Sequence, residues 1–422
     1  MTSLSTPPLQ TARDRAADLD RIIESACATA ALIDCRRDRI RDVLTPVATL
    51  DSIDTEIADS IDLLRTAGQE YAAYRAGDPD TQLRVFLPAN NLLYSMSLFV
   101  ALPSLFYRDV LARPASRVTD AYLELGRILS GGPLDIGERL RTYSQSTFAD
   151  ISQGSVVVFN GKPANGRRVD EECASGLFLG FGTGINPIVI GGDLSGPELS
   201  NAVEATVTAR LYNNGQDCLC PDAIFVDAAV AEDFVPQLVR RLGSVPVVAD
   251  GAVPGLISSP LADMATYDRA VTVLDELGSA VVWSGETTAD QRHCPIAVSV
   301  RRLPEIADSV PELFGPIFNV VIYDRLYEVL DFLDTADTEP YGMYISVFGV
   351  AELVGVDRVG SARNTGARTA FEFENGHDPF GGFGRNGTVS AGVGLEPVSR
   401  PLLLSAELAY YAAGRGGARA NR

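Results

Sequence analysis

Two cysteines one residue apart are the residues in this sequence best suited to covalent chemistry. Cys218 and Cys220 lie in the stretch NNGQDCLCPDAIFV, between an expected helix end at 213–215 and an expected strand at 223–226. A thiol on such a turn is exposed enough to react, and its nucleophilicity depends on its thiolate fraction. The C-x-C spacing is too tight for a disulfide. No second pair lies nearby to complete a zinc site, so we expect no metal.

Length, charge and cysteine distribution exclude several classes of protein. The chain has 422 residues, which is too long for one core and fits two or three domains. Its net charge of −20 argues against a nucleic-acid surface, which must be basic. Six scattered cysteines and an N-terminus without a signal pattern predict a cytoplasmic protein. The longest apolar run, 92–107, is shorter than the roughly 20 residues of a membrane span, so we expect no membrane association and a buried helix and turn there.

Helices and apolar strands alternate along most of the chain. Residues 1–80 are predicted to be helical, and the strands expected after them are 81–88, 109–113, 154–161, 184–193, 223–226, 246–250, 280–285, 319–324 and 344–349. The helices expected between and after these strands are 118–130, 135–145, one beginning near 197, 231–242, 264–277, 326–335 and 351–360. Strands that are apolar throughout indicate an α/β fold with a parallel sheet covered on both faces. Ligands bind such sheets at the carboxyl ends of the strands, here 88–91, 113–116 and 160–166.

The cysteine turn resembles the catalytic segment of the aldehyde dehydrogenase family. N-x-G-Q-x-C followed by P-x-x-I-F-V is similar to that segment, which implies that Cys218 is the nucleophile and leaves Cys220 a possible auxiliary group. VFLPANN (85–91) resembles the family's strand ending in P-W-N, which implies that the Asn90 amide donates to the oxyanion. ELFGPIFNVVIYD (312–324) resembles E-x-F-G-P, so Glu312 is expected to hold the nicotinamide ribose and Phe314 to lie against the nicotinamide.

A further segment resembles the family's pyrophosphate loop. FNGKPANGRRV (159–169) is similar to F-T-G-S-x-x-x-G-R, which implies that Gly161, Lys162 and Gly166 bind the cofactor. Lys162 is the only lysine among 35 basic residues, and it falls where the family usually has serine against the pyrophosphate. A lone glycine pattern is a weak phosphate signal, so a surface cation and a strand end remain alternatives.

The segment VLARPAS (110–116) resembles the family's V-x-K-P-x-E, which binds the adenosine ribose. Arg113 takes the place of the lysine and Ser116 the place of the glutamate. A glutamate there would chelate the ribose hydroxyls of NAD and repel a 2′-phosphate. Because that acid is absent and Arg113 and Arg117 flank the serine, we expect NADP(H) to be preferred over NAD(H).

These matches, with PFGGFGRNG (379–387) as the sixth, occur in family order over residues 85–387. They imply a Rossmann-type cofactor domain with N-terminal helices at 1–185, an α/β catalytic domain at 186–385 and a closing or oligomerisation segment at 386–422. A homo-oligomer is expected. Asn91, Tyr94 and Phe373 are expected to line the substrate tunnel.

The family's general-base glutamate is missing. FGTGINP (181–187) aligns with E-L-G-G-K-x-P, so Phe181 stands in its place, and a phenyl ring cannot accept a proton. One hypothesis is that a thiol, of CoA or a carrier protein, resolves the acyl-enzyme, with reduction of the thioester to the aldehyde favoured. A second is oxidation to the carboxylic acid with His377 as an unusual base. A third is a catalytically silent binding or partner subunit. The sequence leaves the acyl donor and substrate open.

Overall fold

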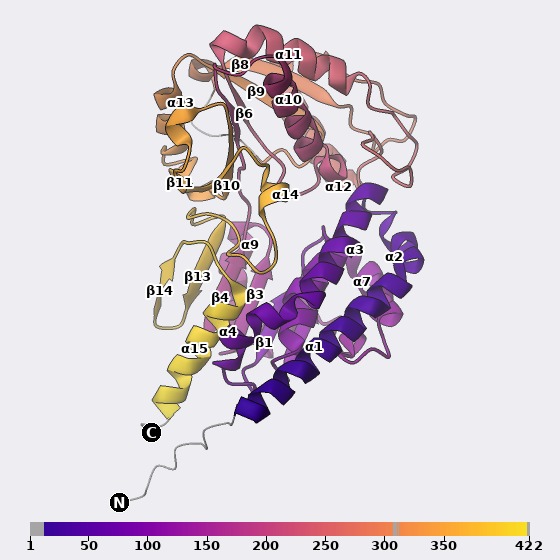
Figure 1. The fold of residues 1–422 in the computed structure, drawn as a ribbon. Helices are drawn as coiled ribbons and strands as arrows, with labels where there is room; N and C mark the ends of the chain where they lie inside the picture. The colour runs from indigo at the N-terminus through magenta and orange to yellow at the C-terminus, as the bar shows by residue number, and fades with distance from the viewer. Residues whose placement is uncertain (1–11, 307–309, 311, 420–422) are drawn as a thin grey trace, which may run out of the picture.

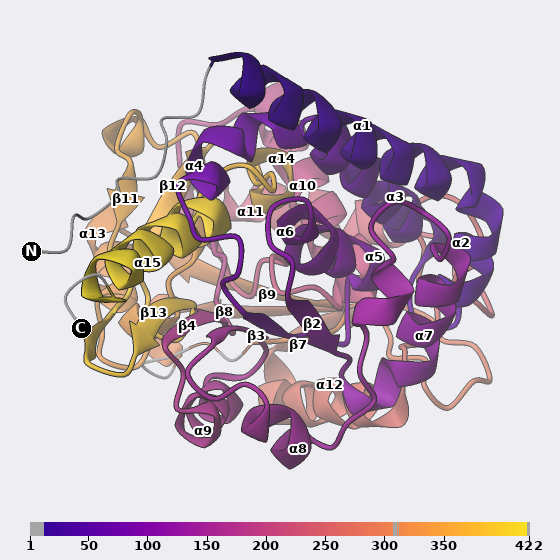
Figure 2. The ribbon, with the colours of Figure 1, turned by 90° about the horizontal axis from the view of Figure 1, so that it is seen from below.

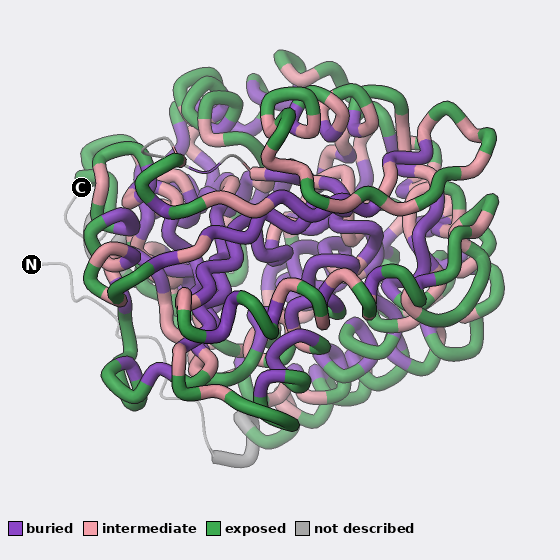
Figure 3. Tube along the Cα trace, turned by 90° about the horizontal axis from the view of Figure 1, so that it is seen from above, coloured by how far each residue is buried: buried purple, intermediate pink, exposed green. Residues whose placement is uncertain are grey.

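The protein, seen here as a computed structural model, is described at residues 12–306, 310 and 312–419. Two sheets form it, each covered by helices, and Figure 1 shows one sheet with its helices above the other. Buried backbone gathers between the layers, and exposed backbone forms the rim (Figure 3). In the described part of the chain, every helix is too short or too polar to cross a membrane.

The predicted N-terminal helical region is confirmed from residue 12 onward; residues 1–11 lie outside the described part. Its helices are α1 (Ala12–Cys35), α2 (Arg37–Leu44), α3 (Leu50–Arg65) and α4 (Tyr71–Arg75). They carry an apolar stripe that packs on one face of the first sheet, and Figure 2 shows α1 and α3 lying across that face. Burial of this stripe, rather than helix propensity alone, stabilises helices of this length.

The first sheet has the order β14-β13-β4-β3-β1-β2. Four neighbouring strands of it are parallel, and they are β1 (Leu83–Phe86), β2 (Val110–Arg113), β3 (Val156–Asn160) and β4 (Leu177–Phe181). Alternate side chains such as Val85 and Phe86 enter the two cores on opposite faces of this sheet. The predicted parallel sheet covered on both faces is therefore confirmed.

Helices connect these strands. The apolar run after β1 forms α5 (Leu92–Met96), a π-helical turn (Ser97–Ala101) and α6 (Leu102–Ser104), as the predicted buried helix. α7 (Thr119–Ile128) follows β2. The helix predicted at 135–145 is wrong: a 3₁₀ turn ends at Arg139, and α8 (Gln145–Asp150) begins only after Ser144, whose hydroxyl accepts from the Thr147 N–H at 3.1 Å. α9 (Pro163–Cys173) and β4 were not predicted.

The chain returns to the first sheet near its C-terminus. β13 (Thr388–Gly392) pairs antiparallel with β4, β14 (Leu395–Val398) pairs with β13, and α15 (Leu404–Arg419) follows. The described part of the predicted segment 386–422 thus extends the sheet that carries β1. The boundaries placed at 185/186 and 385/386 stay predictions.

The chain between β4 and β13 forms the second sheet. Its strand order is β11-β12-β10-β5-β6-β9-β8-β7. Its strands are β5 (Ile188–Ile190), β6 (Ile224–Asp227), β7 (Val281–Ser284), β8 (Ala297–Arg302), β9 (Ile317–Tyr323), β10 (Tyr344–Phe348), β11 (Arg358–Val359) and β12 (Ala362–Gly366). Its helices are α10 (Gly196–Arg210), α11 (Ala228–Leu242), α12 (Met264–Leu277), α13 (Leu326–Leu333) and α14 (Ala370–Phe373). Apolar cores fill both faces of this sheet.

Two of the predicted elements in this region are wrong. The expected strand at 246–250 makes only a single bridge, between Val247 and Ser258. The expected helix at 351–360 is a 3₁₀ turn (Ala351–Leu353) followed by β11, because Gly355 adopts φ +75° and breaks the helical path. β8 was missed, since its sequence AVSVRR ends in two charged residues.

Candidate active site

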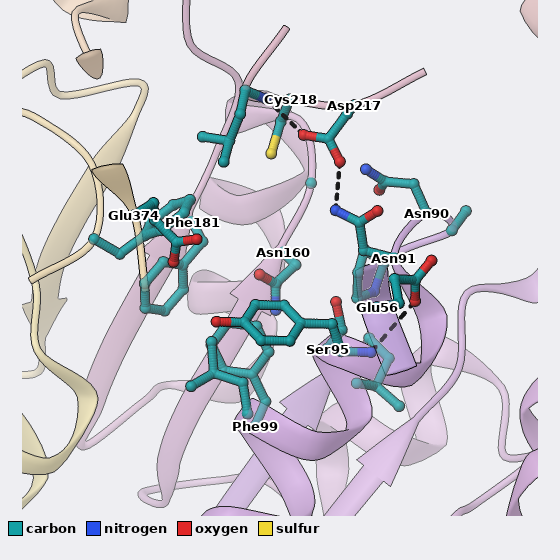
Figure 4. Close-up of a pocket in the computed structure, with 18 of the residues that line it drawn as sticks. Glu56, Asn90, Asn91, Ser95, Phe99, Asn160, Phe181, Asp217, Cys218 and Glu374 are labelled. Carbon is teal, nitrogen blue, oxygen red and sulfur yellow. Dashed lines mark hydrogen bonds between the residues drawn. The ribbon is translucent and has the colours of Figure 1, made fainter. Parts of the chain in front are cut away.

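One large cavity, with a volume of about 810 Å³, opens between the two sheets. The carboxyl ends of β1, β2 and β3 border it from one side, and the cysteine turn and the segment 371–380 border it from the other. This is the edge at which ligands bind open α/β sheets. Figure 4 shows residues from both sides pointing into the same space.

The turn that carries Cys218 is built from left-handed residues. After α10, Asn213, Asn214 and Gly215 have φ values of 47°, 54° and 75°. Asparagine tolerates this conformation, and glycine adopts it without strain. The Asn213 side chain accepts from the Thr49 N–H at 3.0 Å, at the start of α3. The predicted helix stop is therefore also a buried contact between the turn and the N-terminal helices.

A buried arginine fixes this turn against the segment that follows β8. Arg210, at the end of α10, is fully buried and pairs with Asp222 at 3.2 Å. Its guanidinium also donates to the carbonyls of Gly215 (3.0 Å), Pro221 (3.1 Å) and Gly315 (3.1 Å). The Leu313 N–H donates to Asp222 at 2.8 Å. The cysteine turn is thus linked at both ends to residues 313–315, through Arg210 at Gly215 and directly at Asp222.

The thiol of Cys218 points into the cavity (Figure 4). Asn186 holds the backbone by donating its amide to the Cys218 carbonyl at 2.6 Å. Burial raises the pKa of the Cys218 thiol well above its usual range, and the charges of Asp217, Glu312 and Glu374 raise it further. A thiol in this environment is protonated at neutral pH and needs a base when it attacks a carbonyl.

Cys220 lies apart from the cavity. It is 1% exposed, and its Sγ lies 3.7 Å from the Tyr212 carbonyl. Burial raises the pKa of this thiol too. The cavity lining includes Cys218 and excludes Cys220, so the structure gives the predicted auxiliary residue no access to substrate.

Two adjacent asparagines face the thiol from the end of β1. Asn91 has φ 50° and donates its amide to Asp217, whose other oxygen accepts from the Leu219 N–H at 2.8 Å. Asn90 also lines the cavity, and no hydrogen bond among the described residues engages its amide. Figure 4 shows both amides on the Asp217 side of the cavity. Asn90 is therefore available to donate to a substrate oxygen, while Asn91 braces the turn.

The residues predicted to bind a cofactor divide into two groups. Gly161, Lys162, Glu312 and Phe314 line the cavity, as does Arg117. The other group lies outside the lining and is made of Arg113, Ser116 and Gly166.

Arg113 donates to the Tyr143 carbonyl at 3.0 Å and to the Ser116 hydroxyl at 3.3 Å, just beyond the cavity edge. Gly166 faces the Phe159 ring, where a Cβ would lie 3.2 Å from a ring carbon. Its small size therefore serves the close packing of α9 on the sheet, and its contact with a pyrophosphate stays a prediction.

The predicted cofactor residues that line the cavity fit a dinucleotide. Lys162 is the N-cap of α9, and a cation at a helix N-terminus suits a diphosphate. Glu312 pairs with Arg269 at 2.7 Å, which sequence reasoning did not identify. The Arg269 guanidinium also lies 5.8 Å from the centre of the Phe314 ring. An acid oriented in this way can accept from ribose hydroxyls, and the flat ring offers a face for a nicotinamide.

The wall at the missing-base position is aromatic. Phe181, at the end of β4, lies 5.1 Å from Phe99 and 5.5 Å from Phe380, between ring centres. His377, the predicted alternative base, lines the cavity, but both of its ring nitrogens are bonded: Nδ1 to Glu70 at 2.7 Å and Nε2 to the Thr66 hydroxyl at 2.8 Å. Neither nitrogen is free to accept a proton from substrate or water.

Sequence reasoning missed several acids in the cavity lining, among them Glu56, Asp59 and Glu374. Burial raises the pKa of Glu56 and of Glu374 to about 8, and that of Asp59 to about 6. No motif marks them, because α3 and α14 reach the cavity only through the tertiary fold. Of the three predicted tunnel residues, Asn91 and Tyr94 line the cavity, while the Phe373 ring lies outside the lining and contacts the guanidinium groups of Arg363 and Arg368.

Comparison with known proteins identifies the family. Residues 144–396, more than half of the chain, match the model of the aldehyde dehydrogenase family. The chain belongs to the aldehyde dehydrogenase family. The predicted α/β fold, with a Rossmann-type cofactor domain and an α/β catalytic domain, is confirmed by solved structures. The lactaldehyde dehydrogenase of Escherichia coli superimposes with a TM-score of 0.73 at 18% identity, covering 90% of this chain and 85% of that one.

A glyceraldehyde-3-phosphate dehydrogenase of Methanocaldococcus jannaschii, solved with NADP, gives a TM-score of 0.74 at 16% identity, covering 92% of both chains. Among curated sequences, aldehyde dehydrogenase 1A1 of Equus caballus is 22% identical over 66% of this chain and 57% of its own length. The NAD⁺-dependent benzaldehyde dehydrogenase of Pseudomonas putida is 25% identical over 62% of this chain and 51% of its own. The chain thus spans a little over half the length of these two curated relatives.

Proposed function

We propose that this aldehyde dehydrogenase family member is an NAD(P)-dependent oxidoreductase that interconverts an aldehyde and an acyl thioester through a covalent bond to Cys218. The observation that carries the proposal is the Cys218 thiol, which points into a cavity that it shares with Asn90 and Glu312. A silent subunit has no reason to hold these three groups around one space.

The chain's own residues supply the covalent and electrostatic steps. The Cys218 sulfur attacks the carbonyl carbon, and the carbonyl oxygen becomes an alkoxide. The Asn90 amide and the Cys218 N–H are the donors proposed for that oxygen, and one such donor is worth roughly 3–4 kcal/mol. A nicotinamide cofactor, when bound, would supply the hydride chemistry, and Glu312, Phe314 and Lys162 would hold it. Arg210 keeps the cysteine turn against the segment that carries Glu312.

A thiol is the favoured acceptor of the acyl group. At the base position Phe181 packs with Phe99 and Phe380, so the side chain in that position cannot deprotonate water. Water exclusion also protects an acyl-enzyme, which favours reduction of a thioester to an aldehyde. CoA and a carrier protein are the thiols proposed, and the substrate chain is left open.

Oxidation of an aldehyde to the carboxylic acid is the second candidate. The specific observation in its favour is the group of acids in the cavity lining, Glu56, Asp59 and Glu374, since a carboxylate is the usual base for water.

For the cofactor we propose NADP(H) over NAD(H). Arg117 follows Ser116 in the chain and lines the cavity. Its guanidinium pairs at 3.0 Å with Asp263, the N-cap of α12. A guanidinium there suits a 2′-phosphate, and Arg113 lies on the other side of Ser116. Dissociation constants for both dinucleotides test this proposal, and tighter binding of NAD(H) contradicts it. We also propose that the protein acts in the cytoplasm as a homo-oligomer.

The decisive experiment follows NAD(P)H after rapid mixing with aldehyde and NAD(P)⁺, with and without CoA. We expect a burst of one NAD(P)H per subunit, with slow further turnover unless a thiol is present. General-base help is typically worth roughly 10²–10⁴-fold, so turnover to the free acid should be slow by that order. Fast steady turnover without thiol would favour the second candidate. The absence of a burst with every aldehyde and acyl donor would favour a silent binding protein.

A further inference from the structure

The proposed chemistry lacks a proton acceptor for Cys218. The inference that follows names one, and it rests on the proposed function. Attack by a protonated thiol releases a proton, and the thiol that leaves or arrives must gain or lose one. The position that would supply a base holds Phe181, whose ring packs at 5.1 Å from Phe99. Another group bordering the same cavity must therefore handle the proton.

Four titratable groups in the cavity are already engaged, and a fifth, Asp59, is an exposed residue of α3. Glu312 pairs with Arg269 at 2.7 Å. Asp217 accepts from Asn91 and from a backbone N–H. Glu56 accepts from two N–H groups at the start of α5, at 2.9 and 3.3 Å, and so caps that helix. His377 is bonded at both ring nitrogens, as described above.

Glu374 is placed differently. It is the C-cap of α14, where its N–H donates to the Ala370 carbonyl at 2.9 Å, and its side chain lines the cavity. No hydrogen bond among the described residues reaches its carboxylate. Cys218 packs against a buried cluster that includes Ala370 of α14, the helix that Glu374 caps. The charge of Glu374 also raises the pKa of the Cys218 thiol, and Figure 4 shows both residues bordering the same space.

We propose that Glu374 is the catalytic proton acceptor, replacing the family's missing base from a different element of the fold. As the Cys218 sulfur bonds to the carbonyl carbon, the thiol proton passes to a Glu374 carboxylate oxygen, directly or through one water. When a thioester substrate is cleaved, its carbon–sulfur bond breaks and the same proton passes to the departing thiol. In the reverse direction the incoming thiol gives its proton to Glu374 and Cys218 regains one.

The surroundings of Glu374 suit this role. Burial raises the pKa of Glu374 to about 8, and the charges of Asp59 and Asp217 add to this effect. A base is most useful when its pKa lies near the working pH. The titratable and charged groups that surround it are Asp59 of α3, Tyr94 of α5, Asp217 and Cys218 of the turn, Tyr344 of β10, Arg363 of β12 and Asp378 and His377 of its own loop.

The test compares Glu374→Gln with Glu372→Gln. Glu372 lies two residues away on the same helix, is exposed and lies outside the cavity lining; its cap contact to Thr369 needs only an oxygen acceptor, which glutamine keeps. We expect Glu374→Gln to slow the burst by roughly 10²–10⁴-fold and Glu372→Gln to leave it within about twofold. Urea midpoints and NADP⁺ affinity of both variants should match the parent protein.

The pH profile provides the readout that a structural role would not move. In the parent protein the burst rate should rise with pH through about 8, as Glu374 loses its proton. This inflection should vanish in Glu374→Gln. It should persist in Glu374→Asp, with a rate reduced by up to roughly 10²-fold because the carboxylate is displaced.

A Glu374→Gln burst within threefold of the parent rate, or one that keeps the inflection, overturns the proposal while the proposed function stands. A parent protein without any burst rejects the proposed function itself, and this proposal with it.

Discussion

Replacement of Arg210 by methionine should be among the most damaging substitutions in this protein. The guanidinium is fully buried, pairs with Asp222 at 3.2 Å and donates to three backbone carbonyls. Arg210→Met removes the cationic partner of Asp222, which keeps only the Leu313 N–H, and removes one donor from each carbonyl at a fully buried position. Removing one partner of a buried ion pair typically costs about 3–5 kcal/mol, so we expect unfolding to become easier by that amount.

The matched control is Arg241→Met. Arg241 pairs with Glu204 at 2.7 Å, but the two side chains are 31% and 52% exposed, and an exposed pair is typically worth about 0–1 kcal/mol. Urea unfolding of both variants, followed by fluorescence and circular dichroism, measures the difference. A change of less than about 1 kcal/mol between them would refute the argument that the Arg210 contacts hold the fold.

Asp222 adds a pH dependence with a defined sign. Burial raises the pKa of Asp222 to about 7, and Arg210 opposes that rise. Without Arg210 the pKa of Asp222 in the folded protein should rise further. The folded variant therefore loses more stability than the parent protein at a pH above 7, where an unfolded chain carries this carboxyl ionised. The destabilisation of Arg210→Met should therefore be larger at pH 8.5 than at pH 6. Adding Asp222→Asn should recover about 1–3 kcal/mol at the higher pH, since it removes the uncompensated charge.

Three further predictions concern single residues. Cys218→Ala should abolish the NAD(P)H burst and leave dinucleotide affinity nearly unchanged, whereas Cys220→Ala should keep most of the burst; the reverse pattern would show that the turn is misread. Gly215→Ala should lower the thermal midpoint more than Gly255→Ala, because both glycines have positive φ but only at Gly215 would a Cβ overlap a facing carbonyl; equal effects would exclude that overlap. Burial raises the pKa of Glu56 to about 8 from an ordinary 4.5. The protonated carboxyl therefore stabilises the folded protein at low pH, and this stabilisation is lost as pH rises from about 4.5 through 8. Urea midpoints should fall less over this range in Glu56→Gln than in the parent protein, and equal falls would contradict the argument.

Local sequence signals predicted much of the fold. Period and turn residues placed α12 at its observed bounds and β9, β10 and α10 close to theirs. Failures occurred where local signals compete with tertiary packing. The strand expected at 246–250 has apolar residues but no neighbouring strand to pair with over its length, and β4 was missed although all five of its residues are buried.

The candidate site was predictable only where a motif marks it. Cys218, Asn90, Glu312 and Lys162 stand in recognisable stretches, and all four line the cavity. Gly166 stands in such a stretch as well, yet its position serves helix–sheet packing. Spacing in a motif indicates which segment approaches a ligand, but which side chain of that segment reaches it depends on the helix face presented.

Residues contributed by tertiary structure alone were out of reach of the sequence. Arg269 lies within α12, an ordinary amphipathic helix, and its pairing with Glu312 depends on how that helix crosses the 312–315 segment. Glu374 lies three residues before His377, which the sequence did single out as a candidate base. Only the structure shows that the histidine is bonded at both nitrogens while the glutamate carboxylate has no donor among the described residues.

The N-terminal helices belong to the site as much as to the fold. α3 supplies Glu56 and Asp59 to the cavity lining, and the chain just beyond it supplies Thr66 and Glu70, which hold His377. That contact fixes the loop that begins at Glu374, so the proposed proton acceptor is positioned from both directions along the chain: by α14 before it and by the histidine after it. The helices that precede the first strand therefore help to orient the residue proposed here to move the proton of Cys218.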